Sequence, residues 1–177
     1  MPALDRATAL LLVVDFQARL MPAIDQGEAA VANARRLLDA AALFEVPALF
    51  TEQNPAGLGP TVPALAPDPA RVFAKMTFDA TRTPGFLDRV PADRQVVVAG
   101  CEAHVCLLQT VLGLLDAGRR LWVVRDAVGS RRAESKEAAL DRMARHGAEI
   151  VTAEMVVFEW LQSAEHPRFR EALRLIR

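Results

Sequence analysis

Short apolar runs alternate with longer stretches of helical periodicity along most of this chain. The runs are rich in β-branched residues and poor in polar ones, which is typical of parallel strands buried on both faces. Strands are therefore predicted at Ala9–Val14, Val46–Thr51, Arg71–Met76, Gln95–Ala99, Leu121–Val124 and Glu149–Thr152. Apolar residues three and four positions apart predict helices between them. These are expected at Gly27–Glu45, Ala103–Ala117 and Ala133–His146, with shorter ones at Pro84–Val90 and in two segments near the end.

The alternation of strand and helix predicts an α/β fold whose parallel sheet is covered by helices on both sides. We expect a three-layer αβα, Rossmann-like arrangement with a mainly parallel, six-stranded sheet. The connection 54–69 contains five prolines and two glycines, so an irregular loop is predicted there. A chain of 177 residues with no linker or repeat fits one domain, residues 1–177.

Composition and charge narrow the expected partners. The formal net charge is −1 and the basic residues are scattered, so neither a nucleic-acid partner nor a membrane surface is expected. The run Ala9–Val14 is short and flanked by acidic residues, unlike a signal peptide, and no run reaches the ~18 residues of a membrane span. The only cysteines, Cys101 and Cys106, form no disulfide framework, which favours a reducing, cytoplasmic setting. A small molecule is therefore the expected partner.

Polar residues that directly follow the predicted strands are the candidates for chemistry. In open parallel sheets the ligand lies beyond the carboxyl ends of the strands. The residues at those positions are Asp15, Thr51, Glu52, Gln53, Lys75, the segment 100–106 and Asp126.

Cys106 is placed in the first turn of the most apolar predicted helix. Free N–H groups and the positive end of the helix dipole favour a thiolate there, and the same N–H groups could hold an oxyanion. The alternative is that Cys106 is a small buried apolar residue. The three histidines do not provide an obvious base, because His104 points to another helix face, His146 suits a helix end and His166 lies in a polar segment.

Asp15 and Lys75 each interrupt an apolar segment at a strand end. Of the 21 basic residues only Lys75 and Lys136 are lysines, so a lysine between apolar neighbours is notable. A buried carboxylate and a buried ammonium would neutralise each other. The pair can be purely structural, or it can serve Cys106, with Lys75 favouring the thiolate and Asp15 moving its proton.

These segments resemble the isochorismatase-like cysteine hydrolase superfamily, which includes nicotinamidases and N-carbamoylsarcosine amidases. The middle of the chain resembles the isochorismatase domain-containing subgroup most. The resemblance covers nearly the whole chain and rests on LLVVDFQ, TEQNPAGLGPTV, VFAKMTFDA, VVVAGCEAHVCLLQTVLGLLDAG and LWVVRDAVGSR. It implies a catalytic triad of Asp15, Lys75 and Cys106. It also implies a cis peptide bond between Cys101 and Glu102, an oxyanion hole made by the N–H groups of Glu102 and Cys106, and assembly into a homo-oligomer.

Two features depart from particular members of that superfamily. No histidine precedes His104, so the imidazole ligands of the metal-binding nicotinamidases are missing, and we expect neither a metal nor another cofactor. Isochorismatases that act on an enol ether lack the nucleophilic cysteine, so Cys106 argues against isochorismate as substrate.

Several further residues are candidates for lining a substrate pocket, with structural roles as the alternative. Core or surface packing is the alternative for Phe16 and Gln17, and core packing is the alternative for Phe78 and Trp160. For the two polar residues after the second strand the alternative is loop capping. The candidates are Phe16, Gln17, Glu52, Gln53 and Phe78, with Trp160 as a further apolar wall. Asp126 is expected to cap the turn before Ala127–Ser130.

The expected activity is hydrolysis of a small amide or related acyl C–N bond through a thioester at Cys106. Two alternatives stay open. Cys106 could be a redox-active thiol that Cys101 resolves. The chain could also be a non-catalytic binding protein on the same fold.

Overall fold

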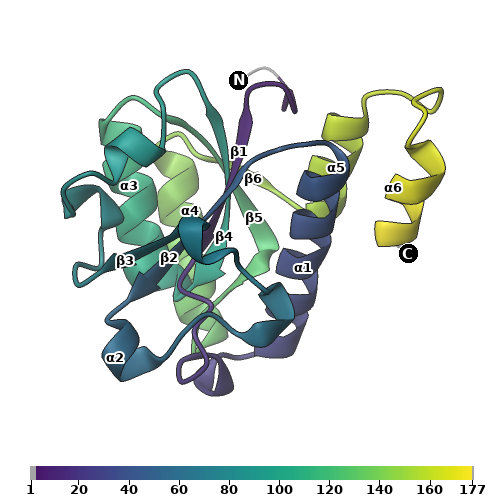
Figure 1. Ribbon diagram of the computed structural model, residues 1–177. Coiled ribbons are helices and arrows are strands. Elements are labelled where there is room, and N and C mark those ends of the chain that lie inside the picture. Colours follow the sequence, from purple (N-terminus) through teal and green to yellow (C-terminus); the bar gives the residue numbers. More distant parts are fainter. Residues whose placement is uncertain (1–2, 177) are drawn as a thin grey trace.

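Six parallel strands form the sheet of the computed structural model, which describes residues 3–176 (Figure 1). Their order across the sheet is β3-β2-β1-β4-β5-β6. All pairs of neighbours run parallel, which confirms the predicted α/β architecture. The strands are β1 (Ala9–Val14), β2 (Ala48–Gln53), β3 (Val72–Lys75), β4 (Gln95–Cys101), β5 (Arg120–Gly129) and β6 (Glu149–Val151).

The two central strands are buried along their whole length. Every residue of β1 and β4 is buried, as their uninterrupted apolar sequences predicted. Their register pairs Val14 with Gly100 at the carboxyl end. A Cβ atom on Gly100 would lie 2.5 Å from the Val14 carbonyl oxygen, so glycine is needed for this close approach. The approach brings the chain that leaves β4 next to the residue that follows β1.

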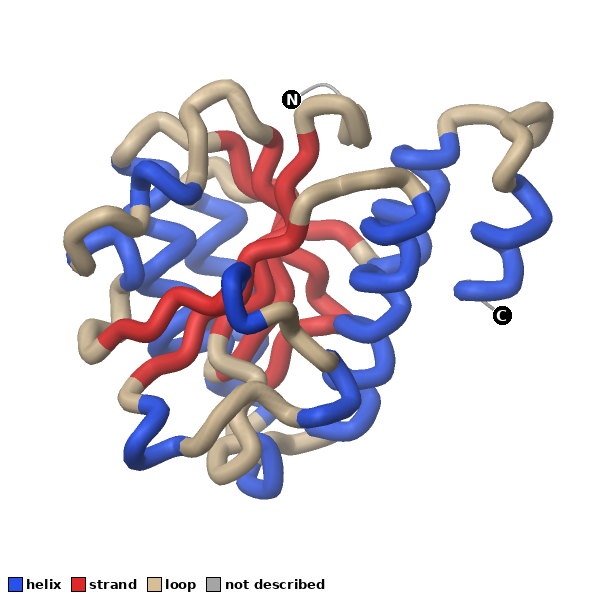
Figure 2. The backbone as a smooth tube through the Cα atoms, in the orientation of Figure 1, coloured by secondary structure: helices blue, strands red, loops and turns tan. Residues whose placement is uncertain are grey.

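Helices cover both faces of the sheet (Figures 1 and 2). Buried side chains form a separate core on each face. One face carries α1 (Gly27–Leu43), α5 (Ala153–Leu161) and α6 (Phe169–Leu175); the other carries α3 (Leu108–Asp116) and α4 (Ala133–Arg145). Each face is filled by aliphatic side chains such as Leu37 and Leu114, both fully buried. Burying one such side chain stabilises the fold by about 1.5–3 kcal/mol. In the part of the chain that the structure describes, no helix is long and apolar enough to cross a membrane.

Strand β5 extends well beyond the predicted Leu121–Val124. It continues through Arg125 and Asp126 to Gly129, and its pairing with β4 shifts register on the way. Between the Val98↔Val123 and Gly100↔Val128 pairs, β5 advances by five residues while β4 advances by two. The polar pair Arg125-Asp126 sits in this irregularity, which is why it resembled the end of the strand.

Two other predicted segments differ in their helical form. The expected helix Ala103–Ala117 begins with a π-helical segment, Ala103–Leu107, before α3. The expected helix Pro84–Val90 is reduced to a 3₁₀ turn at Leu87–Arg89, because Gly85 takes a left-handed conformation with φ 84°. The Pro-rich connection contains the single α-helical turn α2, Pro55–Leu58.

Candidate active site

The carboxyl ends of β1 and β3 place a buried ion pair at the edge of the sheet. Asp15 follows β1, and Lys75 is the last residue of β3. The Lys75 Nζ atom lies 2.7 Å from Asp15 Oδ2, and the side chains are 0% and 1% exposed. Lys75 therefore reaches across the intervening strand β2, and the two charges neutralise each other away from water.

Both members of the pair are held by further hydrogen bonds. The Thr51 hydroxyl of β2 donates to Asp15 Oδ1 at 2.6 Å, and the Thr51 carbonyl accepts from the Asp15 N–H at 3.1 Å. Asp15 itself has φ 52°, in the left-handed region. Lys75 Nζ also donates to the carbonyls of Thr77 at 3.2 Å and Phe78 at 3.4 Å. The carboxylate and the ammonium thus each have a defined orientation.

Cys106 is buried next to this pair, with 8% of its surface exposed. The pKa of its thiol is raised to about 12, mainly by burial and then by the charge of Asp15 and a hydrogen bond to Asp15, although Lys75 lowers it. The prediction that the thiolate forms readily is therefore wrong for the protein at rest, because desolvation outweighs the lysine. The sulfur holds its proton at neutral pH and faces a carboxylate that can accept it.

The segment that carries the cysteine, residues 101–106, is named here the Cys106 loop. Its Cys101–Glu102 peptide bond is cis, as the family resemblance implied. The Glu102 carbonyl accepts from the N–H groups of Val105 at 3.1 Å and Leu107 at 3.2 Å, on either side of Cys106. Cys106 thus lies in the π-helical turn that directly follows the cis bond.

Two side-chain contacts join the Cys106 loop to the segment that follows β5. The Glu102 carboxylate pairs with Arg131, with 2.8 Å between Oε1 and Nε. His104 Nδ1 lies 2.9 Å from the Ser130 hydroxyl. Sequence reasoning missed Ser130 and Arg131, because β5 was expected to end six residues earlier than Ser130. The pairing of Cys101 with Gly129 brings these residues next to the Cys106 loop, and it can be predicted only when the register of β4 and β5 is known.

The polar pocket candidates hold the loop after β2 in place. Gln17 is fully buried; its Nε2 donates to the carbonyls of Gln53 at 3.0 Å and Gly59 at 2.7 Å. Glu52 accepts from the N–H of Thr61 at 2.7 Å and from its hydroxyl at 2.8 Å. Glu52 thus caps the loop, as the structural alternative for it stated. Gln17 also holds this loop through its hydrogen bonds.

The aromatic candidates separate into core and surface. Phe16 and Trp160 are fully buried, and both belong to the core on the α1 face. Phe78 is 51% exposed, and its carbonyl is a partner of Lys75. The Gln53 side chain donates to the Met76 carbonyl at 3.0 Å, next to Lys75. Of the aromatic candidates, Phe78 is the one at the border of the site.

The remaining expectations concern Asp126 and the histidines. Asp126 does not cap the turn before Ala127–Ser130; its Oδ1 accepts from the Ala153 N–H at 2.9 Å and so caps α5. The expectation was wrong because β5 runs through this position. His146 contacts the Arg142 carbonyl, and His166 packs edge-on against Phe44. Within residues 3–176 no group of three or more His, Cys, Asp or Glu side chains is arranged to hold a metal ion.

Fold and site together define a class: three-layer α/β proteins that bring a cysteine, an aspartate and a lysine to the carboxyl edge of a parallel sheet. The comparison with known families agrees, because the isochorismatase domain matches residues 9–155. The chain belongs to the isochorismatase family.

Relatives and solved structures extend this likeness over the whole chain. Human isochorismatase domain-containing protein 2 is 38% identical over 182 residues, covering 99% of this chain and 88% of the human protein. The structure of MAR1 ribonuclease from Caenorhabditis elegans superposes with a TM-score of 0.92 at 34% identity, covering 99% of this chain and 92% of that one. The YcaC gene product from Escherichia coli, an octameric hydrolase of unknown specificity, superposes with a TM-score of 0.90 at 27% identity, covering 99% and 90%.

Proposed function

We propose that this protein is a cysteine hydrolase that cleaves a small amide or a related acyl C–N bond through a thioester on Cys106. The observation that carries the proposal is the buried Lys75–Asp15 pair in contact with the Cys106 thiol. A buried pair that served only to hold the sheet together would not need a thiol beside its carboxylate.

In the first half of the reaction Asp15 accepts the proton of Cys106 while the sulfur attacks the carbonyl carbon of the substrate. A C–S bond forms, and the carbonyl electron pair moves to oxygen, where the N–H groups of Glu102 and Cys106 stabilise it. Asp15 then gives its proton to the leaving nitrogen, and the C–N bond breaks. The products of this half are the free amine and a thioester.

In the second half water releases the acid. Asp15 removes a proton from the water molecule, and the oxygen attacks the thioester carbon. The C–S bond breaks, and the proton on Asp15 returns to sulfur. The negative charge passes from the Asp15 carboxylate to the carbonyl oxygen during each attack and returns to the carboxylate when the tetrahedral intermediate collapses. The Lys75 ammonium stays beside Asp15 throughout as its counter-ion.

The raised thiol pKa is consistent with this sequence. A thiol with a pKa of about 12 is protonated at neutral pH and loses its proton only when the carboxylate takes it during attack. The site then stabilises the negative charge in the transition state rather than a thiolate in the resting protein.

The redox alternative has less support. Cys101 belongs to the core on the α1 face, while Cys106 belongs to the core on the α3 face. Burial also raises the pKa of Cys101 to about 12. Thiols become redox-active through thiolate character and exposure, and a resolving cysteine must reach its partner. Two buried, protonated thiols on opposite sides of the sheet meet neither condition.

We further propose that the protein acts as a homo-oligomer in the cytoplasm, on a small molecule rather than on nucleic acid. The octameric YcaC product supports the first point. Two free cysteines suit a reducing compartment. A net charge of −1 provides little attraction for a polyanion.

The test is a hydrolysis screen over small amides, carbamoyl compounds and esters, comparing the wild type with Cys106→Ala. We expect turnover of at least one amide, complete loss in the variant, and an acyl adduct on Cys106 when the reaction is quenched in acid and analysed by mass spectrometry. Asp15→Asn serves as a second inactive variant that keeps the sulfur. Turnover that survives in Cys106→Ala would remove the thiol from the chemistry.

A further inference from the structure

Glu102 is an acidic residue in an unfavourable place for the proposed reaction. Its N–H group is one of the two donors assigned to the oxyanion, and its side chain is only 11% exposed. The Glu102 charge also raises the pKa of the Cys106 thiol. A carboxylate here opposes both negative charges that develop at the site, one on sulfur and one on the carbonyl oxygen.

Arg131 supplies the counter-charge from a distant part of the chain. Its Nε lies 2.8 Å from Glu102 Oε1. The extension of β5 makes this possible, because Cys101 pairs with Gly129 two residues before Arg131. A Cβ atom on Gly129 would lie 2.5 Å from Ile24 Cγ2 and 3.2 Å from the Cys101 sulfur, so glycine allows the end of β5 to come this close.

We infer that Arg131 is a positioning residue for the Cys106 loop, which neutralises Glu102 so that the loop can hold the negative charges formed at Cys106. The hydrogen-bonding contact between His104 and Ser130 is a second tie between the same two segments. This inference rests on the proposed function and adds to it a residue that acts through Glu102 rather than on the substrate.

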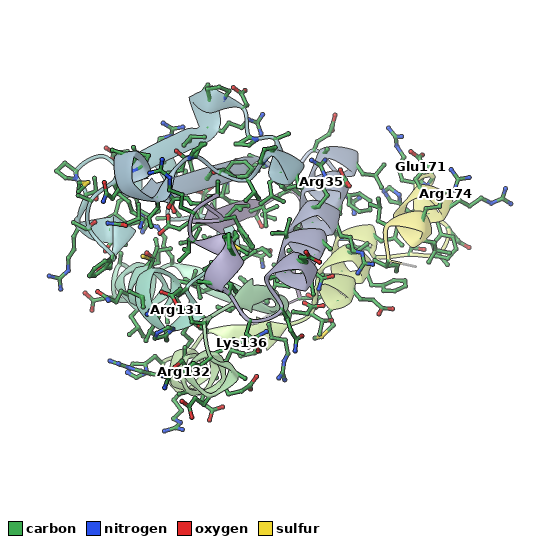
Figure 3. All side chains as sticks on the ribbon, turned by 90° about the horizontal axis from the view of Figure 1, so that it is seen from below. Arg35, Arg131, Arg132, Lys136, Glu171 and Arg174 are labelled. Atoms are coloured by element: carbon green, nitrogen blue, oxygen red, sulfur yellow. The ribbon has the colours of Figure 1, made fainter. Side chains whose placement is uncertain are left out.

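Arg132 provides a matched control. It lines the same cavity of about 430 Å³ as Arg131, His104 and Ser135, and Figure 3 shows Arg131, Arg132 and Lys136 near the start of α4. Arg132 pairs with Glu134 at 3.6 Å on the exposed surface instead of with Glu102. The side chain of Arg131 is 60% exposed, so replacing either arginine by methionine removes a charge without opening the core.

The experiment measures two rates on the full chain: alkylation of Cys106 by iodoacetamide at one fixed pH, and kcat for the best amide from the screen. Arg131→Met is expected to slow both by about tenfold, the effect of roughly one pKa unit on a group far below its pKa. Arg132→Met should leave both within about twofold of wild type. In Glu102→Gln/Arg131→Met, both charges are gone, and the rates should return to within about threefold of wild type.

Recovery in the double variant separates neutralisation from a merely structural role, because a loop that has lost its tether would stay slow. Equal rates for Arg131→Met and Arg132→Met, or a double variant as slow as Arg131→Met, would overturn the inference. If the alkylation rates follow the expected order but the wild type hydrolyses nothing, the proposed function fails and the charge coupling stands. If the wild type hydrolyses amides and Arg131→Met does so equally well, the coupling fails and the proposed function stands.

Discussion

Around the Cys106 sulfur, burial and two opposite charges all act on the same proton. Burial is the largest influence and keeps the thiol protonated; the Asp15 carboxylate adds to it, and the Lys75 ammonium opposes it. The site is therefore not a preformed thiolate waiting for substrate. It is a thiol, a base and a counter-ion held together in a space from which water is mostly excluded.

Replacing Asp15 with asparagine should separate the two roles of this carboxylate. Without the base, hydrolysis should fall by about 10²–10⁴-fold. Iodoacetamide should nevertheless alkylate Cys106 faster than in the wild type at pH 8, because the negative charge that raises the thiol pKa is gone. Kinetics by mass spectrometry would measure the second effect. A variant that is both inactive and slower to alkylate would contradict this account of the thiol.

Cys101 should make the fold sensitive to alkali. Its thiol has a pKa of about 12 in the folded chain and an ordinary value of 9.0 when unfolded. Since the folded pKa is the higher one, the stabilisation is complete below about pH 9 and is lost as pH rises towards 12. The free energy of unfolding should fall by about 1.4 kcal/mol per pH unit from this thiol in that window.

Urea unfolding of the wild type and Cys101→Ala at pH 8, 9.5 and 10.5 would check this dependence. The variant starts from a lower stability because it leaves a cavity, so the slopes are compared rather than the values. The Cys106 thiol contributes in the same direction and remains in the variant. An unchanged slope after removal of Cys101 would show that its proton is not retained in the folded state.

At the scale of the elements, strand register determines which residues meet. The pairing of Val14 with Thr51 places the Thr51 hydroxyl at Asp15 Oδ1. Lys75 lies opposite Gln53 in the pairing of β2 with β3. The candidate site residues are therefore fixed by four adjacent strands rather than by one flexible loop.

Thr51 provides a test of this arrangement. In Thr51→Val the shape of the side chain is kept and the hydroxyl is lost, so Asp15 loses a charge-assisted hydrogen bond. We expect kcat to fall by roughly tenfold or more with KM nearly unchanged. Thr51→Ser keeps the hydroxyl and should retain most of the activity. Equal losses in both variants would indicate that packing, and not the hydroxyl, is what matters at Thr51.

A strand or helix could be predicted where its own sequence has a clear pattern of apolar residues. The apolar runs of β1 and β4 are uninterrupted, and both strands lie where they were expected. The second half of β5 was missed, because Arg125 and Asp126 break its run and the register shift that accommodates them is a property of two strands together. The same limit applied to Arg131, whose partner Glu102 is 29 positions away.

The candidate triad was found in a different way. The patterns identified polar residues at strand ends and left open whether Asp15 and Lys75 form a structural pair or serve Cys106, and the family resemblance implied the triad. The contact between Asp15 and Lys75 follows from the order of the strands, which periodicity does not reveal. The thiol pKa could not be predicted either, because it depends on how completely the sulfur is buried.

At the scale of the whole molecule, the sheet divides the apolar interior into two cores. Leu37 of α1 belongs to one and Leu114 of α3 to the other, and both are fully buried. Each Leu→Ala substitution should cost about 2–5 kcal/mol. Because the sheet separates the sites, the double variant should show the sum within about 0.5 kcal/mol. Urea unfolding of the three variants measures this, and a clear departure from additivity would show that the faces are coupled.

The position of β3 affects how the protein responds to denaturant. This strand has four residues and lies at the outer edge of the sheet, and Lys75 is its one buried residue. Edge segments with little buried surface are the first to open. The Lys75 ammonium is thus attached to an edge strand with little buried surface, so under the proposed function hydrolysis should cease at urea concentrations where the fluorescence of the buried Trp122 and Trp160 is still that of the native chain. Denaturant would abolish hydrolysis at concentrations below those that unfold the chain.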